Sequence, residues 1–143
     1  MYFPDLSTKC SADHGECVRA IGWLAAGQDF PKGEVPPQFL EKLREHLKVP
    51  WQTIKFWGSH RCELCPPNSH APSDSNNLWI PGDAVVYVAP AMILHYIEAH
   101  QYKPPDEFIT AVLECPAQNA SAYLKRMDQF PDREANPERN LKK

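Results

Sequence analysis

The chain lacks the features that lead a protein into or across a membrane. Residues 1–6 contain neither a basic stretch nor an apolar stretch, so we expect no secretory signal. The longest apolar run, residues 84–94, is interrupted by Pro90 and is too short to span a bilayer. We therefore expect a cytoplasmic protein with no membrane partner.

An excess of positive charge is also absent. The chain has 15 lysines and arginines against 18 aspartates and glutamates, which gives a formal net charge of −3 at pH 7. Nucleic acids and anionic lipid surfaces attract basic proteins, so this balance provides no general electrostatic attraction to either. The sequence does not favour a nucleic-acid partner.

A framework in which every cysteine forms a disulfide is excluded by the number of cysteines. There are five, which is an odd number: Cys10, Cys17, Cys62, Cys65 and Cys115. Cys62 and Cys65 form a C-x-x-C motif, which in a reducing compartment more often binds a metal or acts in redox chemistry than forms a structural disulfide.

What is present is the composition of a folded protein. Of the 143 residues, 43% are hydrophobic and 23% are charged, which fits one domain. The 15 prolines are about twice the usual share and predict short elements. We predict a single zinc-stapled domain over residues 1–129 and a mobile polar tail over residues 130–143.

The predicted fold class is α+β, a small and mostly helical domain. A hairpin is predicted from strands at residues 78–80 and 84–89, with Pro81 and Gly82 at the bend. A further short strand is predicted at residues 51–57, and a loop is predicted at residues 66–77. The apolar spacing and the prolines predict helices on either side of the hairpin, over residues 13–24, 36–49, 91–101, 104–115 and 120–127.

The strongest chemical motif runs from Gly58 to His100. Cys62 and Cys65 can direct two sulfurs at one ion from a tight knuckle, and the helix after the hairpin carries His95 and His100. Thiolate and imidazole donors in a four-coordinate shell suit Zn²⁺. The order of knuckle, hairpin and helix predicts a treble-clef-like zinc module packed on N- and C-terminal helices.

The histidine pair leaves the ligand set open. Four residues separate His95 from His100, which is within the range of known zinc fingers. Residues five apart nevertheless differ by roughly 140° around an α-helix, so the helix must loosen near His100 or another residue must complete the shell. His60 is the rival fourth ligand, and His70 and Cys115 are weaker candidates.

The predicted role of the zinc is structural. Two thiolates and two imidazoles close a tetrahedral shell and leave no position for a reactive water. A three-ligand shell would leave one position open, and Glu63 or Glu98 would then be candidates for a general base. The remaining interpretation of both carboxylates is that they are solvated.

Two other activities fit the motif less well. A thioredoxin-like redox site places C-x-x-C at the start of a helix, but Pro66 and Pro67 follow the second cysteine directly. A nuclease of the ββα-metal type needs a histidine on the first strand of the hairpin, and residues 78–80 contain none. A second metal site from Cys10 and Cys17, with His14 and Glu16 between them, matches no common spacing.

Several short motifs together resemble a family of small uncharacterised bacterial proteins. They are Tyr2-Phe3-Pro4-Asp5-Leu6, Gly22-Trp23-Leu24, Phe30-Pro31-Lys32-Gly33-Glu34-Val35-Pro36, Gly58-x-His60-x-Cys62-Glu63-Leu64-Cys65, Tyr87-x-Ala89-Pro90, His95-Tyr96-Ile97-x-x-His100-x-Tyr102-x-Pro104-Pro105-x-Glu107-Phe108 and Ala111-Val112-Leu113. The resemblance extends from Tyr2 to about Cys115. It implies a stand-alone domain of unknown function, with the candidate ligands inside its motifs and Cys10, Cys17 and Cys115 outside them.

These observations lead to two functional hypotheses. The first is a non-enzymatic, zinc-stabilised domain that binds a partner, which we expect to be a protein. The second is a zinc-dependent hydrolase or nuclease with an open coordination position. Neither the partner nor the substrate can be derived from these residues, and the sequence does not determine the oligomeric state.

Overall fold

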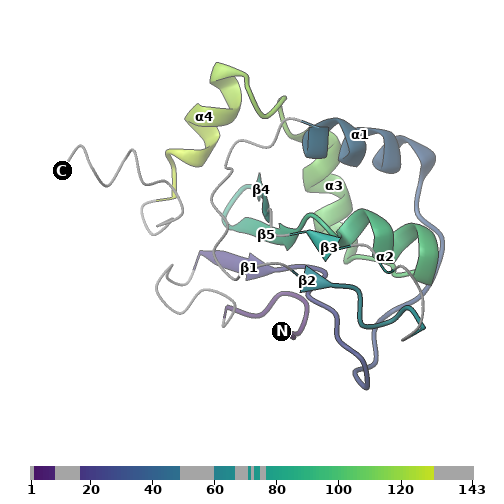
Figure 1. The fold of residues 1–143 in the computed structure, drawn as a ribbon. Coiled ribbons are helices and arrows are strands. Elements are labelled where there is room, and N and C mark those ends of the chain that lie inside the picture. Colours follow the sequence, from purple (N-terminus) through teal and green to yellow (C-terminus); the bar gives the residue numbers. More distant parts are fainter. Residues whose placement is uncertain are drawn as a thin grey trace.

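A computed structural model describes residues 2–8, 17–48, 60–66, 71, 73–74 and 77–130. Over these residues the fold is α+β, as predicted, and a three-stranded sheet lies at its centre (Figure 1). The strands are β1 (Val18–Ala20), β4 (Asn77–Pro81) and β5 (Val86–Pro90), in the order β1-β5-β4. β5 is therefore the central strand.

The predicted hairpin is confirmed. β4 and β5 are antiparallel, with Pro81 opposite Val86, and the Gly82 amide donates to the Val85 carbonyl over 2.8 Å to close the turn. Every residue of both strands is buried. The hairpin is thus covered on both faces, which explains why its sequence is almost continuously apolar.

The prediction of a helix over residues 13–24 was wrong for the part that the structure describes. Val18–Ala20 form β1, which runs parallel to β5, and Ile21 continues into an extended segment. The segment from Val18 to Leu24 is almost wholly buried, so its apolar residues do not mark one face. Periodicity alone does not distinguish a buried strand from a helix in so short a run.

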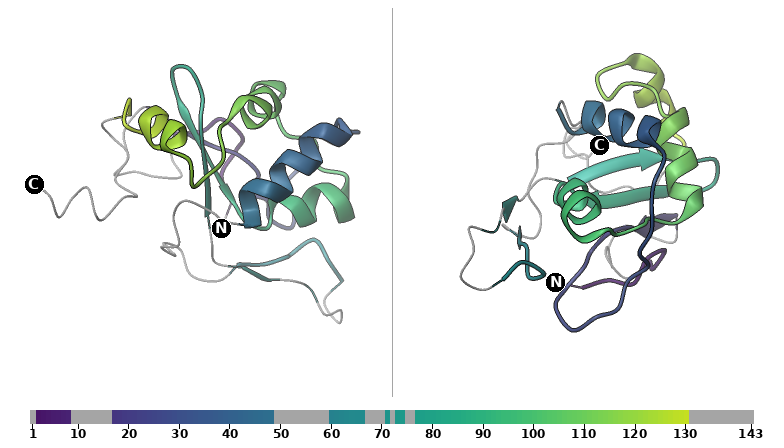
Figure 2. Two further views of the ribbon diagram at one scale, coloured as in Figure 1. Left: turned by 90° about the horizontal axis from the view of Figure 1, so that it is seen from above. Right: turned by 90° about the vertical axis from the view of Figure 1, so that its right-hand side faces the viewer.

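The other predicted helices are present. They are α1 (Pro37–Lys48), α2 (Ile93–His100), α3 (Asp106–Glu114) and α4 (Ser121–Met127). In Figures 1 and 2, α1, α3 and α4 lie along one side of the sheet. The buried residues of α3 are Phe108, Ile109, Ala111 and Val112, whereas Leu113 is 41% exposed.

The outer edge of β1 is covered by residues 2–8, which we call the N-terminal strap. The Leu6 amide donates to the Ala20 carbonyl over 2.7 Å, and the Ala20 amide donates to the Ser7 carbonyl over 2.9 Å. The Phe3 ring meets the Trp23 ring edge to face, with centroids 5.7 Å apart. The strap therefore satisfies backbone groups that an edge strand would otherwise leave open.

The cysteine knuckle lies between the two strands of a short ribbon. β2 (His60–Arg61) pairs antiparallel with β3 (Ser73–Asp74), so the predicted loop at residues 66–77 contains a short strand and ends inside β4. The predicted strand at residues 51–57 lies outside the described residues. A knuckle, a hairpin and a helix thus follow one another in the predicted order.

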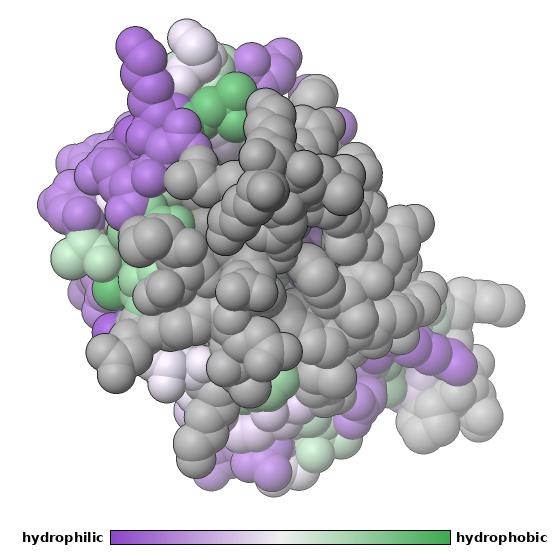
Figure 3. Space-filling view, turned by 90° about the vertical axis from the view of Figure 1, so that its left-hand side faces the viewer, coloured by the Kyte–Doolittle hydropathy of each residue, from purple (hydrophilic) through white to green (hydrophobic). Residues whose placement is uncertain are grey.

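The last described residue belongs to the core. Phe130, where we expected the tail to begin, is only 4% exposed, and residues 131–143 lie outside the described part. On the face shown in Figure 3, the described residues are mostly hydrophilic, with hydrophobic ones in small separate areas. Within the described ranges, we find no helix of the length and apolar content that crossing a membrane requires.

Candidate metal centre

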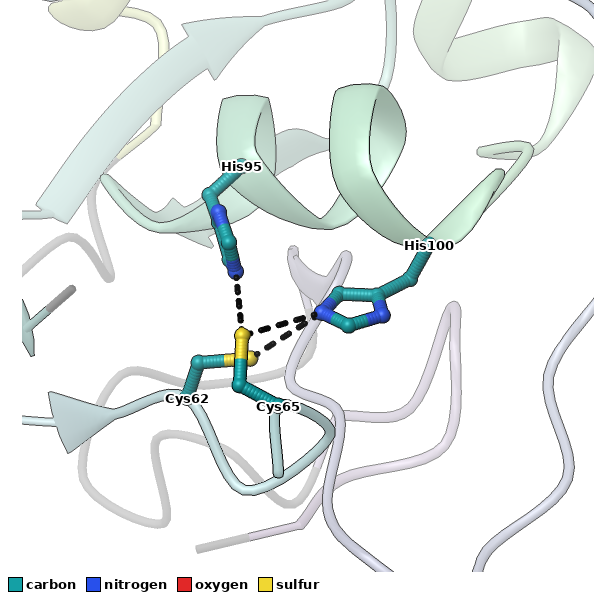
Figure 4. A group of neighbouring side chains, drawn as sticks. All are labelled: Cys62, Cys65, His95 and His100. Atoms are coloured by element: carbon teal, nitrogen blue, oxygen red, sulfur yellow. Dashed lines mark hydrogen bonds between the residues drawn. The ribbon is translucent and has the colours of Figure 1, made fainter. Parts of the chain in front are cut away.

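Four side chains converge between the knuckle and α2 (Figure 4). They belong to Cys62, Cys65, His95 and His100, and one donor atom from each lies within 4.8 Å of the other three. Cys62 is buried and the other three are partly exposed. The structure therefore brings together the four residues that the sequence selected, as a group positioned to bind a metal ion.

The distances between the donors match a tetrahedral shell. The Nε2 atom of His100 lies 3.4 Å from the Sγ atom of Cys62 and 3.5 Å from the Sγ atom of Cys65. The Nε2 atom of His95 lies 3.4 Å from the Sγ atom of Cys65. Tetrahedral zinc with ordinary Zn–S and Zn–N bonds requires sulfur and nitrogen ligands about 3.6 Å apart. These three sulfur–nitrogen distances agree with that value, and the remaining pairs of donors lie within 4.8 Å of each other.

The position of His100 resolves the difficulty with helical spacing. His100 is the last residue of α2, and Gln101 after it adopts a left-handed conformation with φ 60° and ψ 23°. His95 projects from the body of the helix, whereas His100 projects from its end (Figure 4). Their rings meet with centroids 5.1 Å apart and planes at 81°. Two imidazoles five residues apart can thus approach one point from different directions.

Burial and neighbouring groups shift the pKa of two members of the site, His95 and Cys65. Burial lowers the pKa of His95, and the neighbouring His100 lowers it further, which keeps the imidazole neutral. Burial raises the pKa of the Cys65 thiol, and the hydrogen bond and charge of Cys62 add to this, while Arg61 opposes it. A bound cation reverses the preference of the thiols, because it stabilises thiolates directly.

The region that holds these four residues is shared with a protein family. Residues 1–113 match the family described as a domain of unknown function (DUF7919). The chain belongs to this family. The match confirms the resemblance to an uncharacterised family and includes all four members of the Cys₂His₂ group. No curated protein and no solved structure matches the chain.

The structure describes the side chains of only some of the other candidate ligands. His60 lies in β2, but its side chain is outside the description, as are Cys10, His14, Glu16 and His70. Cys17 and Cys115 are described and lie outside the group. Burial raises the pKa of Cys115 to about 11, and its Sγ atom donates to the Pro116 carbonyl over 3.3 Å. Cys115 therefore resembles a core thiol.

The two candidate general bases have partners elsewhere. Glu98 forms an ion pair with Arg44 of α1. The Glu63 carboxylate accepts a hydrogen bond from the Ala26 amide over 3.3 Å. Glu63 thus connects the knuckle to the segment after β1, and Glu98 connects α2 to α1, so both carboxylates have contacts that serve the fold.

Reasoning from sequence missed one pair beside the site. The Tyr102 hydroxyl donates to a carboxylate oxygen of Asp5 over 2.8 Å, although 97 residues separate the two in sequence. Each residue lies inside one of the family-like motifs, at the N-terminal strap and just after His100. Their positions inside these motifs could have drawn attention to both residues. Nothing in either motif indicates, however, that Asp5 and Tyr102 contact each other.

Proposed function

We propose that Cys62, Cys65, His95 and His100 bind one Zn²⁺ in a closed four-ligand shell and that the metal serves the fold. The observation that carries this proposal is the close spacing of the two thiols and two imidazoles, with three sulfur–nitrogen distances of 3.4 to 3.5 Å. Mixed sulfur and nitrogen donors favour Zn²⁺ over Mg²⁺ or Ca²⁺, which prefer oxygen. A shell with four protein ligands holds no activated water.

The metal joins parts of the chain that are far apart in sequence. The cysteines lie in the knuckle after β2, and the histidines lie on α2, beyond the hairpin. Binding free energy from such a site is folding free energy, because the unfolded chain does not preform the shell. Zinc would hold the knuckle against the end of α2.

We infer that the domain acts by binding a partner, which we expect to be a protein, and that it is not an enzyme. A closed shell removes the metal from chemistry, and the order of knuckle, hairpin and helix supports the treble-clef-like arrangement that we propose. The negative net charge disfavours nucleic acid as the partner. The cytoplasm, where thiols stay reduced, suits free cysteines.

The competing function is a zinc-dependent hydrolase or nuclease with an open coordination position. One feature favours it, a cavity of about 370 Å³ that is lined by Leu64 and His100 among others and so reaches the edge of the site. A hydrolase or nuclease of this kind also needs a general base beside the metal. The carboxylates of Glu63 and Glu98 are engaged by Ala26 and Arg44, so the closed shell is the better supported arrangement.

Metal analysis of protein purified without chelator tests the proposal. We expect one zinc per chain, and X-ray absorption at the zinc edge should show two sulfur and two nitrogen neighbours. Removal of the zinc by a chelator should unfold the domain, which circular dichroism detects. Absence of zinc would refute the metal site, whereas three protein ligands and a water would favour the hydrolase.

A further inference from the structure

We propose that Asp5 and Tyr102 couple the metal centre to the N-terminal strap, so that Tyr102 is a positioning residue for metal affinity. This inference rests on the proposed zinc site. It adds that two residues outside the ligand shell control how firmly the shell is held, and that zinc in turn determines how firmly residues 2–8 cover the edge of β1.

The coupling begins next to a ligand. Tyr102 lies two residues after His100 and is completely buried, with 0% of its side chain exposed. Its hydroxyl donates to Oδ2 of Asp5 over 2.8 Å. The other oxygen of the same carboxylate, Oδ1, accepts a hydrogen bond from the Gly22 amide over 3.0 Å. One carboxylate thus joins the strap, the end of β1 and the end of α2.

The segment around Tyr102 has little freedom to move independently of His100. The Gly33 amide donates to the Gln101 carbonyl over 3.0 Å, and the Lys103 amide donates to the Pro31 carbonyl over 3.0 Å. The backbone on both sides of Tyr102 is therefore tied to one loop. The Tyr102 amide donates to the Tyr96 carbonyl over 3.2 Å, which ties Tyr102 to the helix that carries His100. A metal ion that holds His100 would therefore also restrain Tyr102.

The other end of the coupling is the strap. Asp5 stands one residue before Leu6, whose amide donates to the Ala20 carbonyl, and two before Ser7, whose carbonyl accepts from the Ala20 amide. Leu6 adopts a positive φ of 68°, an unfavourable conformation that requires support from its surroundings. The Asp5 carboxylate supplies that support by anchoring the adjacent residue.

Coupling of this kind is reciprocal. If zinc stabilises the docked strap through Tyr102, loosening the strap must weaken zinc binding by the same factor. Coupling free energies between two sites in proteins commonly correspond to a change in affinity of about 5- to 150-fold. Tyr102→Phe removes only the hydroxyl and leaves the aromatic ring in place, so it isolates this link.

The chain contains a matched control. The Tyr87 hydroxyl donates to a Glu107 carboxylate oxygen over 2.7 Å, which is the same chemistry in another part of the fold. Tyr87 is on β5 and Glu107 is on α3, and neither element supplies a member of the Cys₂His₂ group. Tyr87→Phe thus reports the effect of losing a tyrosine–carboxylate bond away from the metal.

The experiment measures zinc affinity and strap docking in the same full-length proteins. Zinc affinity comes from competition with a chromophoric chelator, and docking comes from amide hydrogen exchange at residues 6, 20 and 22 in the zinc-loaded state. We expect Tyr102→Phe to bind zinc at least about five-fold more weakly than Tyr87→Phe and to exchange faster at these amides. Asp5→Asn, which cannot accept both hydrogen bonds, should shift both measurements in the same direction.

Two results would overturn the coupling. One is a zinc affinity of Tyr102→Phe equal to that of Tyr87→Phe, even if the strap exchanges faster. The other is unchanged exchange in both Tyr102→Phe and Asp5→Asn. Failure of the wild-type protein to bind zinc would instead refute the proposed site, so the two failures are distinguishable. If Tyr102→Phe does not fold, Asp5→Asn decides the matter by the same two measurements.

Discussion

The Sγ atom of Cys62 and the Nε2 atom of His100 lie 3.4 Å apart although 38 residues separate them in sequence. Between them the chain passes through the rest of the knuckle, β3, the hairpin and α2. The contact therefore closes a long loop, which costs conformational entropy that a bond to a shared metal would offset. The stability of the domain should depend on this junction.

Loss of one thiol should destabilise the domain strongly. We expect Cys65→Ser to retain less than one zinc per chain and to lose at least about 3 kcal/mol of unfolding free energy, because structural zinc in finger peptides contributes roughly 10–16 kcal/mol of apparent binding free energy. Metal analysis and urea denaturation measure the two effects. Cys17→Ser is the control, since Cys17 is a partly buried thiol outside the group. Equal effects of the two substitutions would contradict the prediction.

The rival ligand can be separated from the favoured one by substitution. We expect His60→Ala to keep one zinc per chain, and His100→Ala to bind zinc much more weakly, because the His100 nitrogen faces both sulfurs. Chelator competition on the two variants gives the comparison. A larger loss in His60→Ala would show that His60 belongs to the shell.

The parts of the fold that sequence predicted are those with strong local signals. Prolines mark the ends of α1 and α3, and an amphipathic pattern identifies both as helices. Pro81 and Gly82 mark the hairpin turn. The four members of the metal group followed from donor chemistry and spacing. These signals are local, so a single sequence displays them.

The parts that sequence missed depend on contacts between distant residues. Val18–Ala20 form a strand because β5 accepts them as a parallel partner, and no local pattern reveals that pairing. The bond between Asp5 and Tyr102 spans the chain in the same way. The convergence of His95 and His100 depends on the end of α2, which idealised helix geometry does not describe.

The Glu98 carboxylate should contribute little to metal binding or stability. It pairs with Arg44, and both side chains are 44% exposed. Exposed ion pairs contribute between about 0 and 1 kcal/mol, so we expect Glu98→Gln to change the unfolding free energy by about 0.5 kcal/mol or less and to leave zinc affinity unchanged. Urea denaturation and chelator competition test this. A large fall in zinc affinity would place Glu98 in the metal chemistry after all.

His46 should make the domain less stable in mild acid. The residue is 1% exposed, and its Nδ1 atom lies 3.2 Å from the Gln118 side-chain nitrogen. Burial lowers its pKa below the usual 6.5. His46 therefore binds a proton more readily in the unfolded chain than in the folded chain. The free energy of unfolding falls as the pH drops below about 6.5 toward the folded-state pKa.

A substitution at His46 measures this contribution. His46→Asn keeps an acceptor for Gln118 but has no titrating group, so we expect it to be less stable than wild type by about 1–3 kcal/mol at pH 7.5. The difference should shrink at pH 5.5, where protonation penalises only the wild type. Urea denaturation at the two pH values compares them, and a difference that stays constant with pH would contradict the assignment.

Two glycines with positive φ should respond differently to alanine. Gly22 has φ +74° and Gly27 has φ +84°, so a side chain strains the backbone at both by about 1–2 kcal/mol. A Cβ atom on Gly22 would also lie 3.1 Å from two side-chain carbons of Ile93, which is fully buried on α2, whereas one on Gly27 meets nothing within 4 Å. Crowding in a packed core adds about 1–3 kcal/mol. We therefore expect Gly22→Ala to lower the unfolding free energy by about 1–3 kcal/mol more than Gly27→Ala does. Urea denaturation measures both losses, and equal losses would show that the core around Ile93 can make room for the added methyl group.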